Sequence, residues 1–117
     1  MPTARHPSIS THVLDTEQGE PARGVPVALS RWQGDALVLL SAAQTDHDGR
    51  IQTLIEGELQ PGTYQLAFDV AAYFRAQGRE VTFLSNVVIA FEVLDVARHY
   101  HVPLLLSRYA CSSYRGS

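Results

Sequence analysis

The sequence predicts an all-β sandwich that carries one short helix. Three observations support this fold class. Short stretches of alternating apolar and polar residues recur along the chain, turns with Gly, Pro or Asp separate them, and one stretch alone has helical periodicity. With 117 residues, of which 45% are hydrophobic, the chain has the size and composition of an ordinary globular domain. We assign residues 1–7 to an N-terminal tail and residues 8–117 to a single domain.

Eight segments have the character of strands. The alternation is clear in the second, where Val25, Val27 and Leu29 share a face. The full set comprises residues 8–14, 25–32, 36–43, 51–55, 63–68, 87–93, 99–106 and 109–115. Turns separate several of them, and the longest turn is expected at residues 18–24. Many short strands with turn signals between them are typical of a sandwich or a barrel.

One segment after residue 68 predicts a helix of about two turns. Asp69 can accept hydrogen bonds from the free amide groups of a first helical turn. Val70, Tyr73 and Phe74 then recur at helical spacing, and Gly78 can end the segment.

The segment at residues 99–106 is apolar on both of its faces. One face carries four large apolar residues, whereas Pro103 and Leu105 share the other face with two histidines. We expect one face to enter the core and the other to be covered by a partner subunit. Because Pro103 cannot donate a ladder hydrogen bond, the strand should be irregular or lie at an edge there.

Charge and composition exclude several classes of function. The net charge of −3, with nine arginines spread along the chain and no lysine, argues against binding nucleic acid. The single cysteine, Cys111, cannot form an internal disulfide bond. No apolar run approaches the roughly 20 residues of a membrane helix, and the first residues lack the apolar core of a signal peptide. We therefore expect a cytoplasmic protein without a membrane partner.

Three histidines are candidate functional residues. His12 lies within the first predicted strand, where a lone histidine is more often structural than functional. His99 and His101 are two residues apart, so they share one face of a strand. Together the three could bind zinc, although the chain has neither a His-Glu-x-x-His motif nor a pair of cysteines. Alternatively, an imidazole at a pocket wall can act as a base, because its pKa lies near neutrality.

An arginine in a loop and the end of the chain complete the candidates. Arg50 is either a solvated loop residue or a fixed guanidinium that grips a planar anionic or carbonyl-bearing ligand. We expect Asp46 and Asp48, which precede it, to form a turn. Residues 114–117, Tyr-Arg-Gly-Ser, are either a frayed terminus or a tail that the preceding strand holds in place.

Taken together, three segments resemble the transthyretin-related family, specifically its 5-hydroxyisourate hydrolase branch. They are Thr-His-Val-Leu-Asp at 11–15 followed by Gly-Glu-Pro-Ala-Arg-Gly-Val-Pro-Val at 19–27, Thr-Asp-His-Asp-Gly-Arg at 45–50, and His-Tyr-His-Val-Pro-Leu-Leu-Leu-Ser at 99–107. The terminal Tyr-Arg-Gly-Ser is the most specific element, because it separates the hydrolases from the hormone carrier. Arg108 stands where the family commonly has proline, and residues 83–87 also lack a proline often found there. These departures concern turns and the shape of an interface.

The resemblance implies a sandwich of two four-stranded sheets with one short helix, assembled as a homotetramer that is a dimer of dimers. Each site would lie where subunits meet. By motif, the catalytic residues would be His12, Arg50 and His101, and the substrate-binding residues would be His12, Arg50, Tyr114, Arg115, Gly116 and Ser117. His99 would have at most a supporting role, and neither a metal nor a cofactor would be needed.

The implied reaction is hydrolysis of 5-hydroxyisourate to 2-oxo-4-hydroxy-4-carboxy-5-ureidoimidazoline in the urate-to-allantoin pathway. Water would be activated by a general base, for which we favour His101, with His12 orienting the substrate or the water. Two other functions remain open at this point. One is a transthyretin-like carrier that binds a small aromatic ligand in the central channel, and the other is an immunoglobulin-like interaction module.

Overall fold

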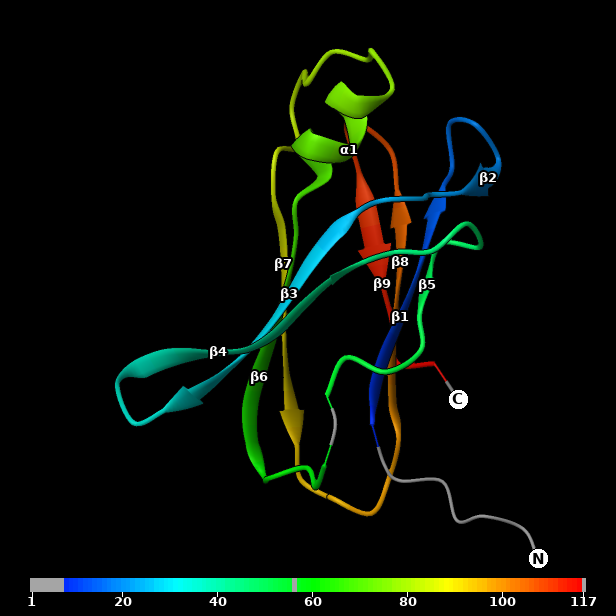
Figure 1. Ribbon diagram of the computed structural model, residues 1–117. Coiled ribbons are helices and arrows are strands. Elements are labelled where there is room, and N and C mark those ends of the chain that lie inside the picture. Colours follow the sequence, from blue (N-terminus) through cyan, green and yellow to red (C-terminus); the bar gives the residue numbers. More distant parts are fainter. Residues whose placement is uncertain (1–7, 56, 117) are drawn as a thin grey trace, which may run out of the picture.

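The computed structural model describes residues 8–55 and 57–116 and contains two β-sheets with one short helix at an end of the sandwich (Figure 1). The β1–β8 sheet has the order β2-β1-β8-β9, with β5 also paired to β1, and comprises β1 (Ile9–Asp15), β2 (Glu20–Pro21), β5 (Arg50–Ile51), β8 (Tyr100–Leu106) and β9 (Cys111–Ser113). The β3–β6 sheet has the order β4-β3-β6-β7 and comprises β3 (Pro26–Gln33), β4 (Ala36–Gln44), β6 (Gly62–Phe68) and β7 (Val87–Val93). The expected all-β sandwich is confirmed. The predicted tail at residues 1–7 and Ser117 lie outside the described residues.

The β1–β8 sheet has five strands where the sequence predicts four. Within the predicted turn at residues 18–24, Glu20–Pro21 pairs with the end of β1, because Gly19 has a positive φ of 67° and folds the chain back. A strand of two residues is too short to show alternation. The strand expected at residues 51–55 is also shorter, since only Arg50–Ile51 pairs with β1 before the chain turns inward to bury Leu54.

The two central strands of the β1–β8 sheet are parallel although they are far apart in sequence. β1 pairs with β8 from Ile9 opposite Tyr100 to Asp15 opposite Leu106. This pairing occupies one edge of β1, so β5 and β2 follow one another along its other edge. Figure 1 shows β1 and β8 running side by side in the same direction.

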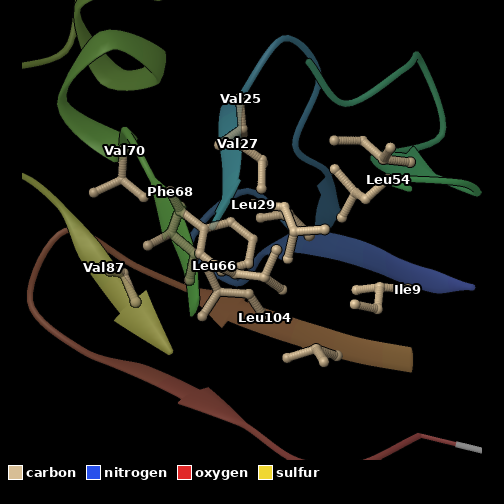
Figure 2. Close-up of a cluster of buried hydrophobic side chains, with 14 of the residues drawn as sticks. Ile9, Val25, Val27, Leu29, Leu54, Leu66, Phe68, Val70, Val87 and Leu104 are labelled. Atoms are coloured by element: carbon tan, nitrogen blue, oxygen red, sulfur yellow. The ribbon is translucent and has the colours of Figure 1, made fainter. Parts of the chain in front are cut away.

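Alternate residues of both sheets form the hydrophobic core. Tyr64, Leu66 and Phe68 of β6 are buried, as their shared face in the sequence predicts. Figure 2 shows the same face of β3 and β6 meeting side chains of the opposite sheet, namely Ile9 and Leu104. Each fully buried side chain of this size contributes about 1.5–3 kcal/mol relative to an exposed one.

Helix α1 (Val70–Ala76) has the ends that the sequence predicts. The Asp69 carboxylate accepts a hydrogen bond from the Ala72 amide at 3.0 Å. Gly78 follows the C-cap with φ of 70°, and the Arg79 amide donates to the Phe74 carbonyl at 2.9 Å, which closes the last turn. Among the described residues, no helix has the length and apolarity that crossing a membrane would require.

A buried carboxylate at the end of β1 links the helical segment to the β1–β8 sheet. Asp15 is fully buried, and its Oδ2 accepts hydrogen bonds from Arg79 Nη1 at 2.7 Å and from the Tyr73 hydroxyl at 2.8 Å. Burial alone would raise the pKa of Asp15, but the hydrogen bonds from Arg79, Tyr73 and the Gln18 amide outweigh it and lower the pKa. The charged form of Asp15 therefore stabilises the fold near neutral pH.

Pro103 interrupts the pairing of β8 with β9, as the sequence predicts, although β8 itself is a central strand. The antiparallel register runs from Leu106 opposite Cys111 to Leu104 opposite Ser113, and it resumes only as a single bridge between His101 and Gly116. Pro103 has no amide hydrogen, and its carbonyl accepts a hydrogen bond from Ser113 Oγ at 2.7 Å. The strand expected at residues 109–115 is therefore reduced to Cys111–Ser113.

Candidate active site

The structure brings His12, Arg50 and His101 together on the outer face of the β1–β8 sheet. Along β1, Ile9, Thr11 and Val13 point into the sandwich, so the residues between them point outward. Arg50 lies opposite His12 in the register of β5 with β1. His101 lies opposite Ser10 in the register of β8 with β1. Since cross-strand partners share a face, the three predicted side chains form one cluster.

The loop before β5 fixes the position of Arg50. Asp46 Oδ1 accepts hydrogen bonds from the amides of Asp48 and Arg50, both at 2.9 Å, so the expected turn is confirmed. The hydrogen bond from the Arg50 amide also lowers the pKa of Asp46. Gly49 has φ of 74°, and a Cβ there would lie 2.5 Å from the Val13 carbonyl oxygen. The close approach of this glycine to β1 places Arg50 beside His12.

His101 is held through its Nδ1 atom by a serine. Ser10 Oγ lies 2.7 Å from His101 Nδ1 and 2.8 Å from His99 Nε2, so one hydroxyl joins the two imidazoles. Burial lowers the pKa of His101, and positive charge on His12, His99 and Arg50 lowers it further. The ring is therefore neutral at pH 7 and can accept a proton.

The chain end reaches this cluster through Gly116. Its amide donates to the His101 carbonyl at 2.8 Å. A Cβ on Gly116 would lie 2.5 Å from His101 Cδ2 and 3.2 Å from Cγ, so only glycine fits against this ring. The backbone at Gly116 thus holds one edge of the imidazole, while Ser10 holds the other.

The two preceding tail residues lie elsewhere. The Arg115 guanidinium carbon is 4.5 Å from the centre of the Tyr100 ring, on the core side of β8 rather than beside His101. Tyr114 is 61% exposed. Both line a cavity of about 430 Å³ between the open edges of the two sheets, together with Phe91 and Val102. Within the single chain, Arg115 is therefore apart from the histidine cluster, and Ser117 lies outside the described residues.

The hypothesis of a zinc site finds no ligand set in the part of the chain that is described. No three side chains of His, Cys, Asp or Glu in residues 8–55 and 57–116 are grouped so that they could hold a metal ion. His99 and His101 instead share the Ser10 hydroxyl. Cys111 is an exposed residue of β9.

Comparison with known proteins decides the family. The model of the HIUase/Transthyretin family matches residues 9–116. The chain belongs to this family. A 5-hydroxyisourate hydrolase from Deinococcus radiodurans is 47% identical over 116 residues, covering 96% of this chain and 98% of the relative.

Solved structures of the HIUase/Transthyretin family have the same fold. The 5-hydroxyisourate hydrolase of Klebsiella pneumoniae is similar with a TM-score of 0.84 and 37% identity, covering 95% of this chain and 99% of that one. Sea bream transthyretin in complex with thyroxine has a TM-score of 0.85 but only 29% identity, covering 92% of this chain and 93% of that one. The fold is thus shared by a 5-hydroxyisourate hydrolase and a transthyretin that binds thyroxine, and the sequence of this chain is more similar to the hydrolases.

Ser10 is the residue of this site that the sequence does not predict. It lies two positions before His12 and therefore on the same face of β1. However, its contact with His101 depends on a parallel pairing across 91 positions of sequence. That pairing has no local sequence signal.

Proposed function

We propose that this chain catalyses the hydrolysis of 5-hydroxyisourate to 2-oxo-4-hydroxy-4-carboxy-5-ureidoimidazoline. The observation that carries the proposal is the convergence of His12, Arg50 and His101 on one sheet face in a chain so similar to hydrolases of this substrate. Two imidazoles and a guanidinium at one surface suit the activation of water and the binding of a substrate rich in carbonyl oxygens.

In the proposed mechanism, His101 acts as the general base. Its neutral ring takes a proton at Nε2 from a water molecule, and the resulting hydroxide bonds to the carbonyl carbon of the amide-like bond in the six-membered ring. The carbon–nitrogen bond then breaks, and the proton on His101 passes to the leaving nitrogen. General-base help of this kind contributes about 10²–10⁴-fold to a rate. The lowered pKa of His101 supports this role, because it leaves the ring unprotonated at pH 7.

Arg50 and His12 bind and orient the substrate in this proposal. The Arg50 guanidinium offers a planar set of donors to the carbonyl oxygen on which negative charge develops. His12, opposite Arg50 in the sheet, orients the substrate or the attacking water. The tail residues Tyr114, Arg115, Gly116 and Ser117 complete the site, and within one protomer Gly116 lies against the His101 ring.

We include a homotetramer, built as a dimer of dimers, in the proposal. Two different surfaces of the protomer support it. β7 and β9 each end a sheet, with no further strand of the described residues paired to their outer edges, and the cavity that Arg115 lines lies between these edges. The outer face of β8 is a second surface, where Leu105 is 36% exposed beside the polar cluster. Two separate self-complementary contacts generate a tetramer, and would place tail residues of one subunit near the site of another.

A carrier function is the alternative, since sea bream transthyretin with thyroxine has a similar fold. A carrier for an apolar ligand has no need of two histidines and an arginine on one face. The polar cluster and the higher identity to hydrolases therefore favour the enzyme.

The test is an assay with 5-hydroxyisourate generated from urate by urate oxidase. The decay of the substrate should accelerate in proportion to the concentration of this protein, and it should remain fast after exhaustive chelation. A decay rate equal to the spontaneous rate would reject the proposed function. Loss of activity on chelation, restored by zinc, would instead reject the metal-independent mechanism. Light scattering that shows a stable monomer would reject the proposed tetramer.

A further inference from the structure

Ser10 and His99 form a hydrogen-bonded chain that ends on His101. Ser10 is only 6% exposed, and its Oγ lies within 2.8 Å of one nitrogen from each imidazole. His99 is exposed and precedes β8, so its ring reaches Ser10 from the rim of the site. No hydrogen bond among the described residues occupies the other nitrogen of His101, Nε2.

Because the Ser10 hydroxyl has only one proton to donate, the hydrogen bonds that link His99, Ser10 and His101 must run in one of two directions. If Ser10 donates to His101 Nδ1, then the neutral His101 ring must carry its proton on Nε2. If Ser10 instead donates to His99 Nε2, its oxygen accepts the proton of His101 Nδ1, and His101 Nε2 keeps a lone pair. The two directions therefore give His101 opposite properties at Nε2. Only the second lets His101 accept a proton from water.

We propose that Ser10 and His99 are positioning residues that keep the proton of neutral His101 on Nδ1 and the lone pair on Nε2. His99 does this by accepting, at its own Nε2, a hydrogen bond from the Ser10 hydroxyl. When His101 takes a proton from water, its Nδ1–H continues to donate to Ser10, so the hydrogen bonds among His99, Ser10 and His101 are unchanged by the reaction. This inference deepens the proposed function and rests on it for the direction of the chain.

The contact with Gly116 keeps the His101 ring in the orientation that its hydrogen bond to Ser10 requires. The His101 edge opposite Nδ1 packs against Gly116, where even a methyl group would be 2.5 Å from Cδ2. Rotation of the ring would break the hydrogen bond to Ser10 and press the ring against the tail backbone. The other charged or titratable groups that act on His101 are His12 and Arg50, and both are on the same outer face.

The exposed position of His99 allows the direction of the chain to be changed without disturbing the core. His99→Glu offers only an acceptor to Ser10 and should preserve the direction. His99→Lys offers only donors, so the Ser10 hydroxyl loses its acceptor at residue 99. We expect it to donate to His101 Nδ1 instead, with the proton of His101 on Nε2. Ser10→Ala removes the hydroxyl that links the two imidazoles and should leave His101 with a mixture of the two tautomers. The His47→Glu and His47→Lys variants make the same charge changes at a histidine whose side chain is 76% exposed, and serve as controls.

The decisive experiment is nitrogen NMR of the assembled protein labelled in its histidines, at a pH where His101 is neutral. In the wild type and in His99→Glu, the His101 Nδ1 signal should be that of a protonated nitrogen, and Nε2 that of an unprotonated one. In His99→Lys the two should be exchanged. The kcat for 5-hydroxyisourate should fall about 10–100-fold in His99→Lys and in Ser10→Ala, within the range that general-base help is worth, with little change in KM.

The outcomes separate this inference from the proposed function. A proton on Nε2 of wild-type His101 would overturn the inference whether or not the protein is a hydrolase. Normal kcat in His99→Lys despite an exchanged tautomer would also overturn it, since the tautomer would then have no effect on turnover. If no variant, including the wild type, accelerates hydrolysis, the proposed function fails, while the tautomer measurement still decides the role of Ser10 and His99.

Discussion

β8 presents aliphatic side chains to the core on one face and a histidine to the site on the other. Leu104 and Leu106 are fully buried on the inner face, whereas Leu105 is 36% exposed on the outer face. His101 lies on that outer face, half-buried and with a lowered pKa. The two faces of one strand can thus have different roles, one in the stability of the fold and the other in the site. We expect inner-face substitutions to reduce the stability of the fold and outer-face substitutions to reduce turnover.

The largest effect on turnover should come from His101→Ala. Removing the proposed base should lower kcat by about 10²–10⁴-fold, because no described residue replaces its Nε2. The melting temperature should change little, since the ring is outside the core. Steady-state assays together with thermal melts of the same preparation test this. Near-normal turnover by a folded and assembled variant would remove His101 from the base role, and His12→Ala and Arg50→Ala should be compared with it.

Leu104→Ala is the matched change on the inner face. It should lower the free energy of unfolding by about 2–5 kcal/mol, because it leaves a cavity at a fully buried position. The kcat of the protein that remains folded should stay near the wild-type value. Chemical denaturation and active-site titration measure the two quantities. A large fall in kcat without loss of stability would show that the two faces are not separable.

Gly116→Ala should reduce turnover with a smaller effect on stability. A Cβ at this position meets the His101 ring at 2.5 Å, so the tail or the ring must move. A displacement of about 1 Å in a reacting group can cost about 10²-fold in rate. Ser112→Ala, at an exposed residue of β9, is the control. Equal activity of the Gly116→Ala and Ser112→Ala variants would show that the tail contact does not position His101.

Burial should hold the pKa of His101 below 6.5, the ordinary value for a histidine. Because its pKa is lower in the folded protein than in the unfolded chain, the unfolded chain binds the proton more readily in this window. Its contribution to stability is therefore complete above pH 6.5 and is lost as the pH falls through the folded pKa. NMR titration of the ring tests this. A midpoint above 6.5 would contradict the burial and positive surroundings described for this site.

The smallest effect should come from His47→Ala. This histidine lies in the loop before Arg50 but is exposed, and its contact with Asp48 is 3.6 Å long. An exposed ion pair of this kind contributes only about 0–1 kcal/mol. Activity and melting temperature should both match the wild type. A clear loss of activity would extend the site beyond the outer face of the sheet.

The sequence predicts the inner face of the molecule better than the outer one. Alternation identifies the buried residues of β6, and the Asp69 cap and Gly78 locate the helix, because these signals are local. Motif resemblance also identifies His12, Arg50 and His101 as candidates. The register that places Ser10 against His101 depends on distant segments, so no local pattern reveals it.

The ends of strands are also poorly predicted. Glu20–Pro21 is too short to alternate, and β9 ends at Ser113 because the register places Ser113 opposite Leu104, the residue that follows Pro103. The placement of Arg115 over Tyr100 follows from that break. Each of these features is set by pairing geometry, which a single sequence does not contain.

The parallel pairing of β1 with β8 has a consequence for how the molecule is made. The strands of the β3–β6 sheet are joined by antiparallel pairings between neighbours in the chain or nearly so, whereas β1 must wait for a partner about 90 positions away, as the Ser10–His101 separation of 91 shows. Pairings between such distant segments form late, because a long loop must close before they gain any contact. During synthesis, β1 thus remains without its central neighbour until residues 100–106 have left the ribosome. Catalytic competence should consequently arise in the last folding step, together with closure of the sandwich, and no earlier intermediate should hydrolyse the substrate.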